Sequence, residues 1–139
     1  MAYGLRLTGH SQADGNELLQ MEPTWWTISE VRNLVPRKWV KTDETGSYTD
    51  ENLDISVELA RQLHEHFKPA MLKEIAFNVS CLESCKNASD ANAVVRGATY
   101  SEYVAQLREK LHTIETALGS DASKFAHFHL CIFEWDSGY

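Results

Sequence analysis

The sequence lacks the short motifs that mark the common classes of enzyme. Its seven glycines do not cluster, so it has neither a glycine-rich phosphate loop nor the Gly-x-Ser-x-Gly turn that presents a nucleophilic serine. No apolar run approaches the roughly 18–20 residues that span a bilayer. The first residues, MAYGLRLTGHSQ, show no apolar stretch behind a basic segment, so we expect neither a signal peptide nor a membrane span.

Cysteines and basic residues are also scarce. Three cysteines are too few for a disulfide framework, and their number is odd, which favours a reducing compartment and predicts a cytoplasmic protein. The 13 basic residues are outnumbered by 20 acidic ones, and the net charge is −7. Phosphate groups repel such a surface, so nucleic acid is not expected as a direct partner. A basic protein is the favoured partner, because the acidic charge would steer its approach.

What is present predicts a single domain over residues 1–139, since this length is typical of one domain. The segment AYGLRLTG, residues 2–9, alternates apolar and other residues and predicts a strand. The segment KFAHFHLCIFEW, residues 124–135, predicts another. Because strand backbones need partners, the simplest arrangement pairs the N-terminal strand with the C-terminal one. Residues 38–48 are a candidate third strand.

Four helices are expected between these strands. Thr27 and Glu30 form a capping-box pattern for a first helix, which Pro36 stops. Ser56 is the expected cap of a second helix, and Pro69 separates it from a third over residues 70–86. The fourth follows a capping-box pattern at Thr99 and Glu102, and it ends before Gly119. The predicted fold class is therefore α+β, with about four helices packed on a small sheet.

The most acidic segment, DETGSYTDENLD over residues 43–54, is the candidate partner-binding region. An aromatic side chain among carboxylates would provide affinity while the carboxylates speed association. The aromatic candidate is Tyr48, and the flanking acidic residues are Asp43, Glu44, Asp50, Glu51 and Asp54. The alternative is a solvated loop without a binding role.

The C-terminal strand holds the candidate metal ligands. His127, His129 and Cys131 alternate along it and share one face, so their side chains could converge on a zinc ion. Cys81 or Cys85, four residues apart on a predicted helix, would supply a fourth ligand. The spacing matches no standard zinc motif, so packing within a half-buried strand is the alternative. Apart from this zinc site, no cofactor is expected.

These observations favour a binding protein over an enzyme, and they assign no catalytic residue. Immunity proteins, which neutralise bacterial toxins, share this profile of small size, acidic charge and missing catalytic motifs. The similarity is one of class and not a family match. We therefore predict an immunity-type inhibitor that occludes a basic partner such as a toxin. The alternatives are a small metal-dependent enzyme that uses the His-x-His-x-Cys face and a subunit of a larger assembly. The oligomeric state does not follow from the sequence.

Overall fold

The computed structural model describes residues 2–36, 39–43, 49–87 and 90–135, and it confirms the α+β class. In this part of the chain a five-stranded antiparallel sheet is joined to three α-helices, not the four that were predicted. The elements in chain order are β1 (Ala2–Ser11), β2 (Glu17–Met21), α1 (Ile28–Leu34), β3 (Val40–Asp43), β4 (Thr49–Ile55), α2 (Val57–Lys86), α3 (Ala91–Leu118), a single 3₁₀ turn (Ala122–Lys124) and β5 (Phe125–Trp135).

The sheet has the strand order β2-β1-β5-β4-β3. The expected pairing of the terminal strands is confirmed, because β1 runs antiparallel to β5 with Leu7 opposite Leu130 and His10 opposite His127. The candidate third strand is β3. Neither β2 nor β4 was predicted, and residues 49–55, for which a solvated loop was the alternative, form a strand. The acidic side chains of β4 have little strand propensity of their own, so its pairing with β5 decides its conformation.

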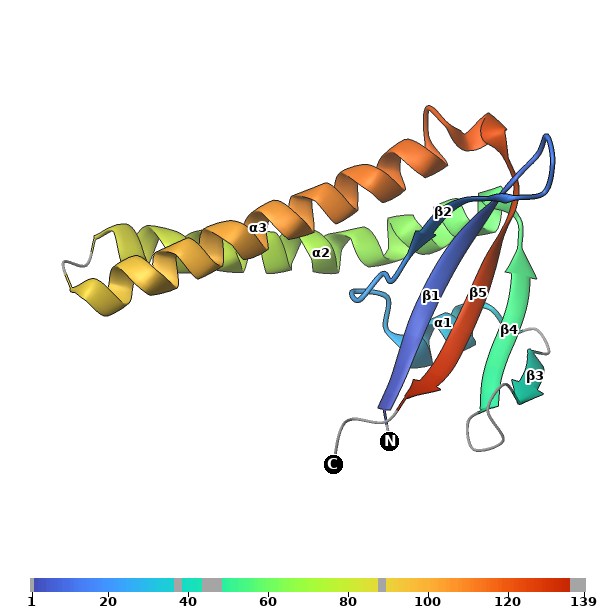
Figure 1. Ribbon diagram of the computed structural model, residues 1–139, viewed down its shortest axis with the longest axis horizontal. Helices are drawn as coiled ribbons and strands as arrows, with labels where there is room; N and C mark the ends of the chain where they lie inside the picture. Colours follow the sequence, from blue (N-terminus) through green and yellow to red (C-terminus); the bar gives the residue numbers. More distant parts are fainter. Residues whose placement is uncertain (1, 37–38, 44–48, 88–89, 136–139) are drawn as a thin grey trace.

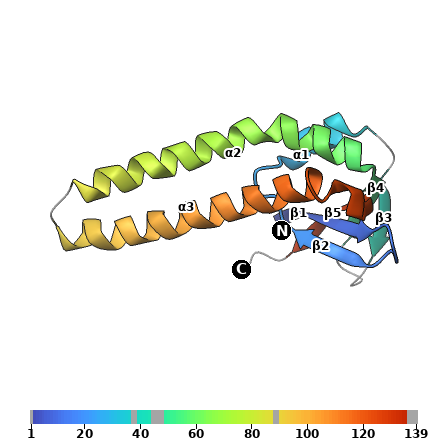
Figure 2. The ribbon, with the colours of Figure 1, turned by 90° about the horizontal axis from the view of Figure 1, so that it is seen from above.

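Three buried side chains of β5, Phe128, Leu130 and Ile132, alternate onto one face of the sheet with Leu5 and Leu7 of β1. All three α-helices lie on that side of the sheet (Figure 2). Trp26, which precedes α1, is 2% exposed and stacks on Phe67 of α2. Its neighbour Trp25 is 6% exposed, so both adjacent tryptophans anchor this segment in the core. The opposite face of the sheet carries no described helix.

The helix α2 is continuous through Pro69, so the predicted boundary at this residue is wrong. A proline inside a helix removes one hydrogen bond and costs about 3 kcal/mol. The residues on either side offset that cost, because Phe67 and Met71 are buried in the core. The predicted cap at the start of α2 is confirmed, since Ser56 Oγ accepts a hydrogen bond from the Leu59 amide.

The helix α3 begins at Ala91, so the predicted start at Thr99 is also wrong. Asp90 caps it by accepting a hydrogen bond from the Ala93 amide, while the Thr99 hydroxyl donates to the Val95 carbonyl inside the helix. Together α2 and α3 form a long hairpin that extends well beyond the sheet (Figure 1). Neither these helices nor α1 contain an apolar stretch that could span a bilayer.

Candidate functional site

Residues from the two predicted sites meet on the face of the sheet that the helices leave open. Side chains alternate along a strand, so the buried Phe128 and Leu130 send His127 and His129 to the opposite face. Asp54 of β4 lies directly across from His129 in the register. The pairing of β4 with β5 thus brings a predicted partner-binding carboxylate to the predicted metal ligands, although 75 residues separate Asp54 and His129 in the sequence.

His129 is held between two oxygen atoms. Its Nδ1 lies 2.7 Å from Asp54 Oδ1, and its Nε2 lies 2.8 Å from Asn52 Oδ1. Since a carboxylate only accepts, Nδ1 carries a proton, and Nε2 pairs with the side-chain amide of Asn52. Both ring nitrogens of His129 are then occupied, and neither offers a lone pair to a metal ion. The ring fixes the direction of the Asp54 carboxylate.

His10 joins this group, although no feature of the sequence singled it out. It lies opposite His127 in the register, and the two rings stack with centroids 4.8 Å apart and planes 14° from parallel. His10 Nδ1 lies 3.1 Å from the Gly15 carbonyl oxygen. Since a carbonyl only accepts, this nitrogen carries the proton. The alternation of β1 puts His10 on the face of Thr8, but only the strand register reveals that His127 is its neighbour.

These side chains line a shallow pocket of about 410 Å³, together with Thr8 and Glu17. His127 Nε2 lies 3.7 Å from Asp54 Oδ1, which is longer than a hydrogen bond. The Asp54 side chain is 66% exposed, while those of His127 and His129 are 38% and 30% exposed. The pocket therefore presents a carboxylate to solvent with imidazole rings around it. We call this surface, made of Thr8, His10, Glu17, Asp54, His127 and His129, the histidine face.

The three predicted metal ligands do not share one environment. Cys131 lies on the same side of β5 as His129 but is only 6% exposed. In the register it lies between Arg6 of β1 and Asn52 of β4. Cys81 and Cys85 belong to the last turns of α2, at the end of the hairpin that points away from the sheet (Figure 1). The described residues contain no group of three or more His, Cys, Asp or Glu side chains that could hold a metal ion.

The predicted partner-binding residues also do not share one face of the sheet. Asp50 is 6% exposed. Glu51 follows it and points to the other face of β4, where it forms an ion pair with Arg32 of α1. Asp43 ends β3, and Glu44 and Tyr48 lie outside the described residues. Of the predicted partner-binding side chains that can be described, Asp54 is thus the one that the histidine face presents to solvent.

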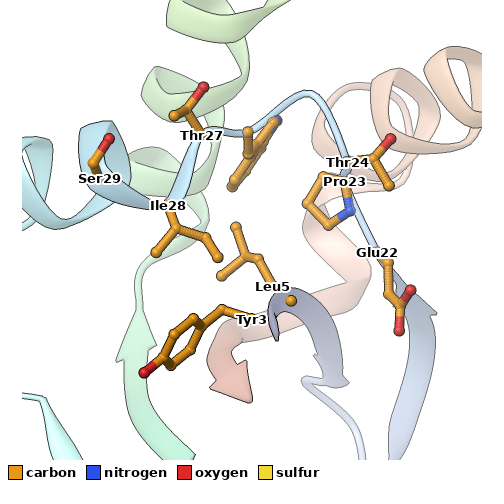
Figure 3. A pocket seen from close by; sticks show the side chains of 10 residues that line it. Tyr3, Leu5, Glu22, Pro23, Thr24, Thr27, Ile28 and Ser29 are labelled. Carbon is orange, nitrogen blue, oxygen red and sulfur yellow. The ribbon is translucent and has the colours of Figure 1, made fainter. Parts of the chain in front are cut away.

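A second pocket, of about 530 Å³, lies between the start of β1 and the segment that leads into α1. Tyr3, Leu5 and Ile28 point toward one another in it (Figure 3). Among the described residues that line it, Glu22 is the only carboxylate, and the hydroxyls come from Tyr3, Thr24, Thr27 and Ser29. Those residues include no histidine, cysteine or basic side chain to act with Glu22, so the histidine face remains the better candidate site.

No family model, curated protein or solved structure matches this chain.

Proposed function

We propose that this chain is a small binding protein of the immunity-inhibitor type, which occludes a basic protein partner through its histidine face. The single observation that carries the proposal is Asp54, an exposed carboxylate whose direction is fixed by His129 on the sheet face opposite the described helices. A carboxylate held in this way is prepared to accept hydrogen bonds from a cation on the partner, because little side-chain freedom is lost on binding.

An arginine is the partner group that fits this surface best. Its planar guanidinium pairs with a carboxylate through parallel hydrogen bonds and stacks on flat rings. The stacked rings of His10 and His127 lie beside Asp54 and offer such a surface. Glu17, at the rim of the same pocket, adds a second negative charge. Arginine is also enriched among the residues that dominate protein interfaces.

The alternative of an assembly subunit has weaker support. Exposed apolar side chains do occur on the hairpin, where Leu72 is 47% and Phe77 67% exposed. Because five residues turn a helix through about 140°, these two side chains point to different sides of α2. Leu72 and Phe77 therefore do not share one apolar patch of the kind that marks an assembly interface. Val94 and Val95, which are 70% and 67% exposed, lie nearer the tip of the hairpin, in the first turn or two of α3.

The proposal is tested by affinity capture from the cells that make the protein. The wild-type chain is expected to retain a basic protein, and Asp54→Asn to retain much less of it. Loss of a charged hydrogen bond weakens binding roughly tenfold to a hundredfold. Folding should survive, because exposed charges contribute little to stability.

Glu83→Gln is the matched control. It removes one negative charge from an exposed residue near the far end of α2, where Glu83 pairs with Lys86. If attraction by the overall charge alone governed binding, both variants would weaken capture equally. Equal capture by the wild type and Asp54→Asn would also refute the proposal, and the partner surface would then have to be sought elsewhere.

A further inference from the structure

The contact surface between α2 and α3, which we call the seam of the hairpin, changes in residue type along its length. Near the sheet it is apolar and buried, with Phe67 and Met71 on α2 and Leu107 on α3. Toward the tip, the inward positions of α2 are instead Asn78, Cys81 and Cys85. Asn78 is 7% exposed, and its side-chain amide donates to the Glu74 carbonyl of its own helix. Apolar residues also lie in this half of the hairpin, among them the half-buried Leu82 of α2 and the buried Ala93 of α3, so the two cysteines stand beside apolar packing.

Cys81 and Cys85 form a pair of thiols on one side of α2. Residues four apart on a helix are surface neighbours, with Cβ atoms about 5–6 Å apart. Both cysteines are half-buried, and neither is in a disulfide. Their sequence spacing thus places two sulfur atoms side by side at the boundary between the seam and solvent.

The facing helix α3 contributes a hydroxyl and a glycine. Tyr100 of α3 lies close to Cys81, and the negative charge of an ionised Cys81, together with hydrogen bonding between the two groups, raises the pKa of the Tyr100 hydroxyl. Opposite Cys85 lies Gly97, where an added Cβ would be 3.4 Å from the Cys85 Cβ. Because Gly97 has no side chain, α3 comes close to α2 beside the Cys85 Cβ and the Leu82 side chain.

This geometry suits a bridging ion better than a disulfide. A disulfide requires Cβ atoms about 3.5–4.5 Å apart, so the thiols could not join without distorting the end of α2. In a two-coordinate site the two sulfur atoms lie on opposite sides of the ion, so they are farther apart than the bonded sulfurs of a disulfide. With metal–sulfur bonds of about 2.3 Å, the length found for zinc, the two sulfur atoms are about 4.6 Å apart. Two cysteine side chains whose Cβ atoms are about 5–6 Å apart can place their sulfurs at that distance.

We propose that Cys81 and Cys85 form a two-coordinate site for a soft monovalent cation of the copper(I) type. Thiolates select such ions, whereas zinc requires four ligands, and the described residues of the hairpin contain no such group. Binding replaces two thiol protons, which are released to solvent, and the copper stays in its monovalent state, so no oxidant is needed. Tyr100 is a positioning residue, because its hydroxyl fixes the Cys81 sulfur.

The test is a titration of the whole chain with copper(I), kept reduced by ascorbate, in competition with a coloured copper(I) chelator. The wild type is expected to take up one equivalent, and equimolar zinc should not displace it. Cys81→Ser and Cys85→Ser should each lower the affinity by about 10²–10⁴-fold, since one anchored thiol gives its neighbour a high effective concentration. Cys131→Ser, which alters the buried cysteine of β5, should bind like the wild type.

A second measurement guards against loss of folding in the variants. Copper(I) should raise the melting temperature of the wild type and of Cys131→Ser, but not that of the other two variants, whose circular dichroism should match the wild type. Retention of tight binding by either single variant would refute the site. So would loss of binding in Cys131→Ser, or displacement of the copper by equimolar zinc.

Discussion

His64 of α2 provides a direct test of how this core tolerates a titratable group. Its side chain is 3% exposed, and neither ring nitrogen has a hydrogen-bond partner among the described residues. Glu115 Oε2 lies 3.7 Å from His64 Nε2, which is too long for a hydrogen bond, and the same oxygen lies 3.1 Å from Lys68 Nζ. Burial lowers the pKa of His64 below its ordinary 6.5, and the charge of Glu115 only partly opposes this.

The direction of the pH effect follows from proton linkage. Because the folded state has the lower pKa, the unfolded chain binds the proton first as the pH falls. The stability from keeping this ring neutral is therefore complete above about pH 6.5 and is lost as the pH falls toward the lowered pKa. One proton changes the unfolding free energy by at most about 1.4 kcal/mol per pH unit. Between about pH 7.5 and about pH 5.5 we expect His64 to account for a loss of up to about 1.4 kcal/mol.

The assay is urea unfolding at both pH values, for the wild type and for His64→Leu, which replaces the ring by an apolar side chain of similar size. The variant should lose less stability on acidification, and it should be at least as stable as the wild type near neutral pH, since it buries no unpaired nitrogen. His66→Leu is the matched control, because its side chain is 45% exposed on the same helix. Equal losses in the wild type and His64→Leu would refute the reasoning. If acidification instead stabilised the wild type relative to His64→Leu, the result would indicate that protonated His64 forms an ion pair with Glu115.

Two further predictions concern the core and the metal alternative. Leu107 is 2% exposed, so Leu107→Ala should lower the free energy of unfolding, measured in urea, by about 2–5 kcal/mol. Leu111 is only partly buried, so Leu111→Ala should lower it by clearly less. Equal losses in the two variants would contradict the orientation of α3. Protein purified without chelator should contain no stoichiometric zinc, and EDTA should leave its melting temperature unchanged, because both nitrogens of His129 are occupied. Elemental analysis showing one zinc per chain, with a lower melting temperature in EDTA, would establish the metal-dependent alternative.

Local patterns predicted some elements well and others poorly. The alternation of β1 and β5 and the cap at Ser56 are local signals, and the structure has all three. The two errors at the long helices share a cause, since Pro69 and Thr99 carry local boundary signals that helix packing overrides. A two-helix hairpin buries a stripe of side chains along its whole length, and interrupting either helix would expose part of that stripe.

The sequence by itself determined the α+β class, the pairing of its terminal strands and the face of β5 that carries His127 and His129. These follow from side-chain periodicity and from the need of backbone groups for partners, which act over a few residues. Only the tertiary structure decided that β4 pairs with β5, that Asp54 meets His129, and that His10 stacks on His127. The physical reason is register: a shift of one residue between strands exchanges the faces of every side chain, and the packing of the whole core sets that register.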